Sequence, residues 1–153
     1  MVAQDTLNLP AYEFQQRERA GKREIYDPIR QKYVRLTPEE WVRQHFVQYL
    51  IRDRGVPRGL VTVEQSFDYQ GMARRADIIV HDRAGQPLLM TECKAPAVPL
   101  EQATFDQVAR YNRVVDALFL IITNGLEHYC CRIDRAAESY EFLDAVPAYD
   151  AMQ

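Results

Sequence analysis

Cysteine is scarce in this sequence. The three cysteines are Cys93, Cys130 and Cys131, and two of them are adjacent. This arrangement excludes a disulfide framework, and neither a CxxC motif nor a Cys/His spacing typical of zinc sites is present. Free cysteines are typical of a reducing compartment, so we expect a cytoplasmic protein.

Long hydrophobic runs are also missing. No apolar stretch approaches the length of a membrane span, and the N-terminal residues lack the basic start and apolar core of a secretory signal. The chain has no repeats, no low-complexity tract and no GxxxxGK[ST] phosphate-binding loop, which argues against an ATP-driven motor in this chain. We therefore expect a water-soluble domain with no membrane partner.

The composition that is present is ordinary for one globular domain. The 153 residues are 47% hydrophobic and 27% charged, which suffices for a single core. The net charge is −3, but the segment from Arg17 to Arg58 holds 11 basic and 6 acidic side chains. This basic segment predicts a phosphate-binding surface. The alternative is a solvated charged face with no partner.

Capping residues and hydrophobic periodicity predict two main helices. The first begins with Thr37 as N-cap and Pro38 at the first helical position, with Glu40 completing a capping box, and ends near Arg54. The second covers 101–115, and a short helix is expected around 12–23. Strands are predicted over 60–67, 76–82, 87–94, 117–122 and 127–133.

The order of these elements predicts an α/β fold with a mixed β-sheet flanked by helices. One helix precedes three strands, a second helix follows them, and then a further strand, which is the order αβββαβ. A helix between the third and fourth strands implies a right-handed crossover and a parallel strand pair.

Two strand-length apolar segments carry charged residues where buried strands should have none. The polar stretch 81–87 between them predicts a hairpin turn. A turn centred between Ala84 and Gly85 pairs residues whose numbers add to 169, which places Asp77 opposite Glu92. Lys94 points to the same face as Glu92. Two facing carboxylates repel each other unless a cation or a proton lies between them, and oxygen ligands suit Mg²⁺ or Mn²⁺.

Simpler interpretations of these three residues remain open. Asp77 alone fits a turn or edge carboxylate, and a surface pair of Glu92 with Lys94 would contribute about 0–1 kcal/mol. The apolar context of both segments favours a functional cluster, because buried charges are costly unless they are paired or bind a metal.

The predicted helices supply further candidates. Glu39 shares a helical face with Val42 and Phe46, so it faces the sheet and could join the carboxylates; alternatively it only complements the helix dipole. We prefer Glu39 to Glu40 as a ligand because capping accounts for Glu40. On the second helix, Gln107 and Tyr111 lie four residues apart on one face, which is also compatible with an ordinary half-exposed surface.

Together these residues resemble the motifs of the PD-(D/E)XK nuclease superfamily, in the branch with a QxxxY motif. The motif residues are Asp77, Glu92-Cys93-Lys94 and Gln107 with Tyr111. More closely, the chain resembles small proteins related to the N-terminal nuclease domain of the type I restriction enzyme motor subunit, in the segment YVRLTPEEWVRQ (33–44) and in TNG (123–125). Ala76 stands where the motif name has proline, a position that varies widely in the superfamily.

The resemblance implies a restriction-endonuclease-like core at 37–148, an N-terminal arm at 1–36 and a tail at 149–153. It implies a metal-dependent DNA endonuclease that hydrolyses phosphodiester bonds. The implied Mg²⁺ or Mn²⁺ ligands are Asp77, Glu92 and the backbone carbonyl of Cys93, with Glu39 binding directly or through water. Lys94 would orient or help deprotonate the attacking water and offset the charge that develops on the phosphate. Gln107 and Tyr111 would position DNA or the surroundings of Lys94. The DNA phosphates would contact Arg43, Arg74, Arg75 and Arg110.

The resemblance also indicates which binding partners to expect. It implies DNA, and it leaves open a helicase or translocase, another restriction-modification subunit, or a homodimer. The alternative function is a catalytically silent or partner-dependent DNA-binding module of the same fold.

Overall fold

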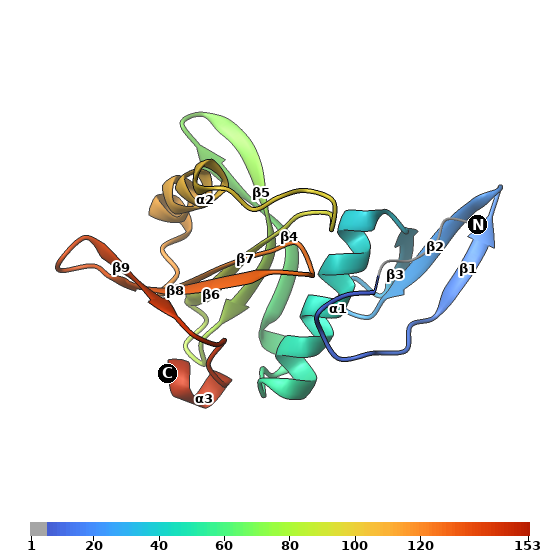
Figure 1. Ribbon diagram of the computed structural model, residues 1–153, viewed down its shortest axis with the longest axis horizontal. Coiled ribbons are helices and arrows are strands. Elements are labelled where there is room, and N and C mark those ends of the chain that lie inside the picture. Colours follow the sequence, from blue (N-terminus) through green and yellow to red (C-terminus); the bar gives the residue numbers. More distant parts are fainter. Residues whose placement is uncertain (1–5) are drawn as a thin grey trace.

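The computed structural model describes residues 6–153, which form an α/β fold around a six-stranded sheet (Figure 1). Its strands lie side by side in chain order, and only β6 and β7 run parallel. The parallel pair and the predicted order of helices and strands are confirmed. The strands are β4 (Val61–Tyr69), β5 (Met72–His81), β6 (Pro87–Cys93), β7 (Phe119–Thr123), β8 (His128–Asp134) and β9 (Ser139–Leu143).

Two helices cover opposite faces of this sheet. Helix α1 (Pro38–Asp53) packs on one face through Val42, Phe46 and Leu50, and α2 (Gln102–Val115) packs on the other through Val108 (Figure 1). The start of α1 is as predicted, since Thr37 Oγ1 accepts a hydrogen bond of 3.1 Å from the Glu40 N–H. None of the helices within residues 6–153 combines the length and apolarity needed to cross a membrane.

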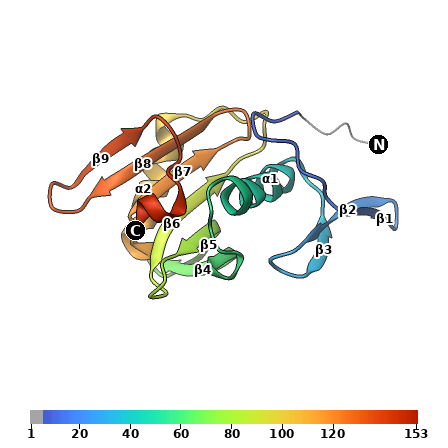
Figure 2. The same ribbon diagram turned by 90° about the horizontal axis from the view of Figure 1, so that it is seen from below.

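A second, three-stranded antiparallel sheet precedes α1 and projects beside it (Figure 2). It consists of β1 (Gln16–Arg19), β2 (Lys22–Asp27) and β3 (Lys32–Arg35). The short helix expected around 12–23 is therefore wrong. Ala20 and Gly21 have φ of 52° and 77°, the paired left-handed conformation of a tight hairpin turn, which ends any helix at this point.

The C-terminal part adds structure that the sequence analysis did not predict. Strand β9 forms the outer edge of the large sheet beside β8. The segment 149–153, expected as a tail, contains the short helix α3 (Tyr149–Met152). Tyr149 is buried, and its hydroxyl donates a 3.0 Å hydrogen bond to the carbonyl of His81. A 3₁₀ turn, η1 (Arg58–Leu60), connects α1 to β4.

The cap of α1 yields a test of the fold. Thr37→Ala removes the acceptor for the Glu40 N–H and should lower the free energy of unfolding by about 1 kcal/mol. Thr37→Ser keeps a hydroxyl and serves as the control. Urea unfolding followed by circular dichroism measures both; equal stability of the two variants would show that the cap contributes nothing.

Candidate functional site

The β5–β6 hairpin has the predicted register. Its pairs are Ile78 with Thr91, Ile79 with Met90, and Val80 with Leu89, all with numbers adding to 169, before a bulge next to His81. The strand pairing ends at Ile78 and Thr91, and a side-chain hydrogen bond joins the carboxyl groups of the next two residues, Asp77 and Glu92. Asp77 is 9% exposed, and its Oδ2 accepts a 2.8 Å hydrogen bond from the Cys93 N–H.

The two carboxyl groups perturb each other. Burial raises the pKa of Asp77, while the Cys93 N–H, the charge of Arg43 and a hydrogen bond from Glu92 act in the opposite direction. Burial and then the charge of Asp77 raise the pKa of Glu92 to about 8. Lys94 Nζ lies 3.5 Å from Glu92 Oε1. The hairpin thus brings the three predicted side chains together, with Asp77 buried and Glu92 and Lys94 half-buried.

Arg43 is placed differently from the expectation that it binds DNA. Its side chain is buried, with Nη2 3.1 Å from Asp77 Oδ1 and Nη1 3.1 Å from Glu64 and 3.2 Å from Glu40. Position 43 lies on the sheet-facing side of α1, so the guanidinium enters the protein interior. Arg43 holds the carboxylates in place and is not available to DNA phosphates.

Glu40 also departs from the capping box expected of it. Its backbone N–H caps the helix as predicted, but its carboxylate turns inward and accepts hydrogen bonds from Arg30 (2.9 Å), Arg43 (3.2 Å) and Gln44 (3.0 Å). A buried carboxylate beside two guanidinium groups is satisfied by them, and that partnership outweighs the exposed capping contact.

Glu39 lies near the carboxyl pair without such partners. Burial and then the charge of Asp77 raise its pKa, while Arg43 and Lys94 lower it. Within residues 6–153 no basic side chain forms an ion pair with Glu39, in contrast to Glu40. The two neighbouring glutamates therefore play different parts in the structure.

Glu64 is a site residue that the sequence analysis missed. It lies in β4 between the pairs Val63–Ile78 and Gln65–Ala76, at the position facing Asp77. Its φ of 51° is unusual for a non-glycine residue within a strand. The carboxylate contacts Arg43 and Arg30, and Arg75 Nη1 is 3.8 Å away. A charged residue in the middle of a predicted strand was the available signal.

Gln107 and Tyr111 share one face of α2 as predicted. The Gln107 side-chain amide donates to the Tyr111 hydroxyl at 3.2 Å, and the Tyr111 ring packs edge-on against Phe67 and Tyr69 of β4. Across residues 6–153, no hydrogen bond or ion pair joins either side chain to Lys94. The structure brings this pair to β4 and leaves its role beside Lys94 a prediction.

The remaining predicted arginines are more accessible than Arg43. Arg75 and Arg110 are exposed, on β5 and α2. Arg74 is half-buried, with Nη2 3.6 Å from the sulfur of Met72.

The carboxyl pair fits a hard divalent cation in its donor chemistry. Two oxygen-ligand side chains face each other, and a positive ion would relieve the repulsion that raises the pKa of Glu92. Within residues 6–153, no three His, Cys, Asp or Glu side chains are close enough to hold an ion by themselves. Water or backbone oxygens would have to complete the coordination.

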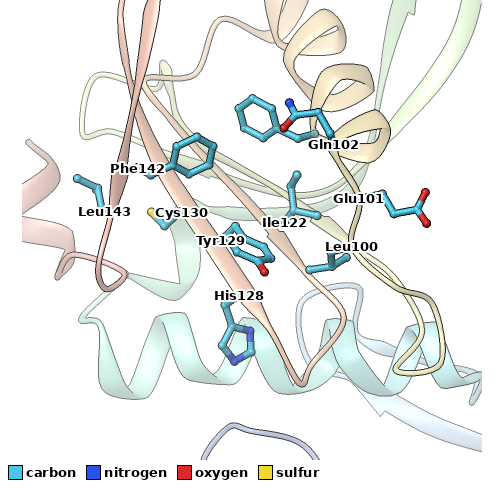
Figure 3. A pocket seen from close by; sticks show the side chains of 10 residues that line it. Leu100, Glu101, Gln102, Ile122, His128, Tyr129, Cys130, Phe142 and Leu143 are labelled. Atoms are coloured by element: carbon cyan, nitrogen blue, oxygen red, sulfur yellow. The ribbon is translucent and has the colours of Figure 1, made fainter.

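A separate hollow of about 420 Å³ lies between the start of α2 and strands β8 and β9 (Figure 3). Its walls are largely apolar, and it does not include the carboxyl pair. The lining residues are Leu100, Glu101, Gln102, Phe105, Ile122, His128, Tyr129, Cys130, Phe142 and Leu143.

The raised pKa of Glu92 predicts how stability depends on pH. An unfolded chain ionises this group near 4.5 and the folded protein near 8, so the metal-free protein should lose stability as the pH rises between these values. Glu92→Gln cannot ionise. Between pH 5 and pH 9, the free energy of unfolding of Glu92→Gln should therefore rise relative to that of wild type by more than about 1 kcal/mol. A pKa difference of one unit between the folded and unfolded states corresponds to about this much.

The measurement is denaturant unfolding in chelator at both pH values. Glu141→Gln, at an exposed position of β9, is the matched control and should follow wild type. If Glu92→Gln also follows wild type across this range, Glu92 is not held protonated by its surroundings.

Comparison with known proteins shows the family. Residues 38–147 match the family described as the type I restriction enzyme R protein N terminus. The fold is similar to a fragment of a candidate HsdR subunit of a type I restriction enzyme from Vibrio vulnificus YJ016, with a TM-score of 0.55 and 21% sequence identity. The match covers 76% of this chain and 24% of that chain. No curated protein sequence matches significantly.

The chain thus spans about a quarter of the length of that HsdR chain, and its mixed sheet with flanking helices matches a restriction-endonuclease-like core. Because the family match covers most of the sequence, including all of α1, the β5–β6 hairpin and α2, this chain belongs to the family of type I restriction enzyme R protein N-terminal domains.

Proposed function

We propose that this chain is a metal-dependent DNA endonuclease that hydrolyses phosphodiester bonds at the end of the β5–β6 hairpin. One observation carries the proposal: Asp77 on β5, Glu92 on β6 and Lys94 just after β6 lie together, and the buried Asp77 and the half-buried Glu92 both have raised pKa values. Membership of a restriction enzyme family supports nucleic acid as the substrate.

Asp77, Glu92 and the backbone carbonyl of Cys93 would hold Mg²⁺ or Mn²⁺, with Glu39 contacting the ion through water. When bound, the ion supplies Lewis acidity and lowers the pKa of a coordinated water. The facing carboxyl groups support this assignment. So does Glu39, which lies within electrostatic range of Asp77 and forms no ion pair with a basic side chain in residues 6–153.

Each protein group then has a stated task. The Cys93 N–H and Arg43 hold the two oxygens of Asp77 in fixed directions, which preorganises one ligand. Lys94 orients the attacking water and offsets the negative charge that develops on the phosphate. Gln107 and Tyr111 position the DNA, and Arg74, Arg75 and Arg110 bind its phosphates, which gives salt-sensitive affinity with little sequence preference.

A second candidate is a nuclease module that acts only with a partner, or a catalytically silent DNA-binding module. The family match supports it, because that family is described as the N terminus of a type I restriction enzyme R protein. In this case the partner would be a helicase, a translocase or another restriction-modification subunit in the cytoplasm. A homodimer is the corresponding alternative for a stand-alone enzyme.

Cleavage assays with a Lys94 variant test the first candidate. Purified protein with Mg²⁺ or Mn²⁺ should nick supercoiled plasmid or cut a single-stranded oligonucleotide, and chelator should stop it. Lys94→Ala should lower the rate by about 10²-fold or more, the usual loss when a group that stabilises developing negative charge is removed. Arg132→Ala, exposed on β8, is the control.

The same assay separates the candidates. Cleavage by Lys94→Ala at the wild-type rate would remove Lys94 from the site. Absence of cleavage in wild type, together with metal binding that requires Asp77 and Glu92, would favour the partner-dependent module.

The two neighbouring glutamates give a further test. Glu39→Gln should weaken metal-dependent cleavage while leaving the melting temperature close to wild type, because Glu39 lies outside the ion-pair network. Glu40→Gln should lower stability instead, since it leaves Arg30 and Arg43 short of a buried partner. Loss of metal binding in Glu40→Gln but not in Glu39→Gln would reverse the assignment.

A further inference from the structure

The outward face of the small β1–β2–β3 sheet carries an unusual set of side chains. The register sets Arg17 and Arg35 on either side of Glu24, and it sets Arg19 directly opposite Lys22. Side chains alternate along each strand, so residues in register share a face with those two positions away. This face therefore holds Arg17, Arg19, Lys22, Glu24, Tyr26, Tyr33 and Arg35.

The opposite face is turned toward the rest of the protein. Ile25 is fully buried and Asp27 is 1% exposed. Asp27 pairs with Arg30, which in turn contacts Glu40 and Glu64 at the candidate site. The inward face thus fixes the small sheet against the nuclease-like core, and the outward face remains in solvent.

The cations of the outward face are not neutralised from within. Arg17, Arg19, Lys22 and Arg35 are all exposed, and Glu24 is engaged by Arg17 at 2.7 Å. Within residues 6–153, no carboxylate forms an ion pair with the other three. Like charges directly opposite each other destabilise a strand pair, so the Arg19–Lys22 pair opposes folding of this sheet. A polyanion across this face would relieve that repulsion.

Aromatic rings lie among these cations. Tyr26 and Tyr33 contact each other edge to face at 5.3 Å, and the Arg17 guanidinium lies 4.0 Å from the centre of the Tyr33 ring. Cations interleaved with aromatic rings on a sheet are typical of surfaces that bind nucleic acid strands through their phosphates and bases.

We propose that the outward face of β1–β2–β3 is a second DNA-binding surface, which contacts the phosphate backbone of the strand that the hairpin site cleaves. The inference rests on the proposed function. The sheet lies before residue 38, outside the segment that matches the family, and beside α1, whose Arg43 reaches Asp77 (Figure 2). Arg19, Lys22 and Arg35 supply the phosphate contacts.

The test compares two triple variants of equal charge change. One neutralises the sheet (Arg19→Gln, Lys22→Gln, Arg35→Gln), and the control neutralises three exposed arginines elsewhere (Arg58→Gln, Arg113→Gln, Arg132→Gln). Fluorescence anisotropy measures binding of a labelled single strand and of the matching duplex at several salt concentrations. Chelator is present throughout, and circular dichroism checks that each variant folds.

The sheet variant should bind at least 10-fold more weakly than the control at low salt. The slope of log affinity against log salt should fall in magnitude by about 2–3 units, since three phosphate contacts each release about 0.7–0.9 counterion. Whichever DNA form shows the larger loss identifies the strand form that this face takes. Equal affinities and slopes in the two triple variants would overturn the inference.

Failure of this inference is distinguishable from failure of the nuclease proposal, because the binding assay contains no metal. Cleavage with no difference between the triple variants overturns the DNA-binding face and leaves the nuclease intact. Sheet-dependent DNA binding without cleavage supports the face and contradicts an autonomous nuclease. A third outcome is that the sheet variant binds anionic vesicles more weakly than the control variant while both bind DNA equally well. That result would assign the face to a membrane surface and overturn the inference.

Discussion

The rest of the structure depends on the ion pairs of one buried side chain, Arg43. It joins α1 to β5 through Asp77, to β4 through Glu64, and to its own helix through Glu40. Glu40 and Glu64 also bind Arg30, which extends the network to the small sheet. A buried charge is tolerated only when its partners are in place, so these contacts are strongly interdependent.

This network makes the two carboxyl groups of the candidate site unequal. Asp77 has both oxygens held, one by Arg43 and one by the Cys93 N–H. Glu92 has Lys94 at 3.5 Å and Asp77 as a repelling neighbour, and its pKa is raised to about 8. Asp77 is thus preorganised by two donors, while burial and the charge of Asp77 favour the protonated form of Glu92 until a cation replaces the proton. Such a pair suits a bound metal better than a structural ion pair.

Local rules predicted the parts of the structure that local chemistry decides. The hairpin register follows from the turn at 81–87 and the period of two, and the start of α1 follows from Thr37 and Pro38. The parallel pair follows from a helix between two strands. Together these features predict that Asp77, Glu92 and Lys94 lie close to one another.

Tertiary contacts decided what the sequence could not reveal. The Glu40 carboxylate accepts a hydrogen bond from Arg30 and does not cap the helix. Arg30 lies ten residues earlier in the sequence, and the two side chains meet only in the folded chain. Arg43 was expected to contact DNA phosphates because helical periodicity does not show that buried carboxylates lie beside a given position in the folded protein. The left-handed conformation of Glu64 has no sequence signature comparable to glycine. The small sheet was missed because its turn, Ala20-Gly21, lies inside a charged segment that resembles a helix.

The central claim is that Asp77 and Glu92 form a metal site, and calorimetric titration of Mn²⁺ into the purified protein tests it most directly. The account predicts binding of one ion to wild type, loss of that binding in Asp77→Asn and in Glu92→Gln, and retention in Glu141→Gln. Equal binding in wild type and all three variants, or absence of binding in wild type, would contradict it.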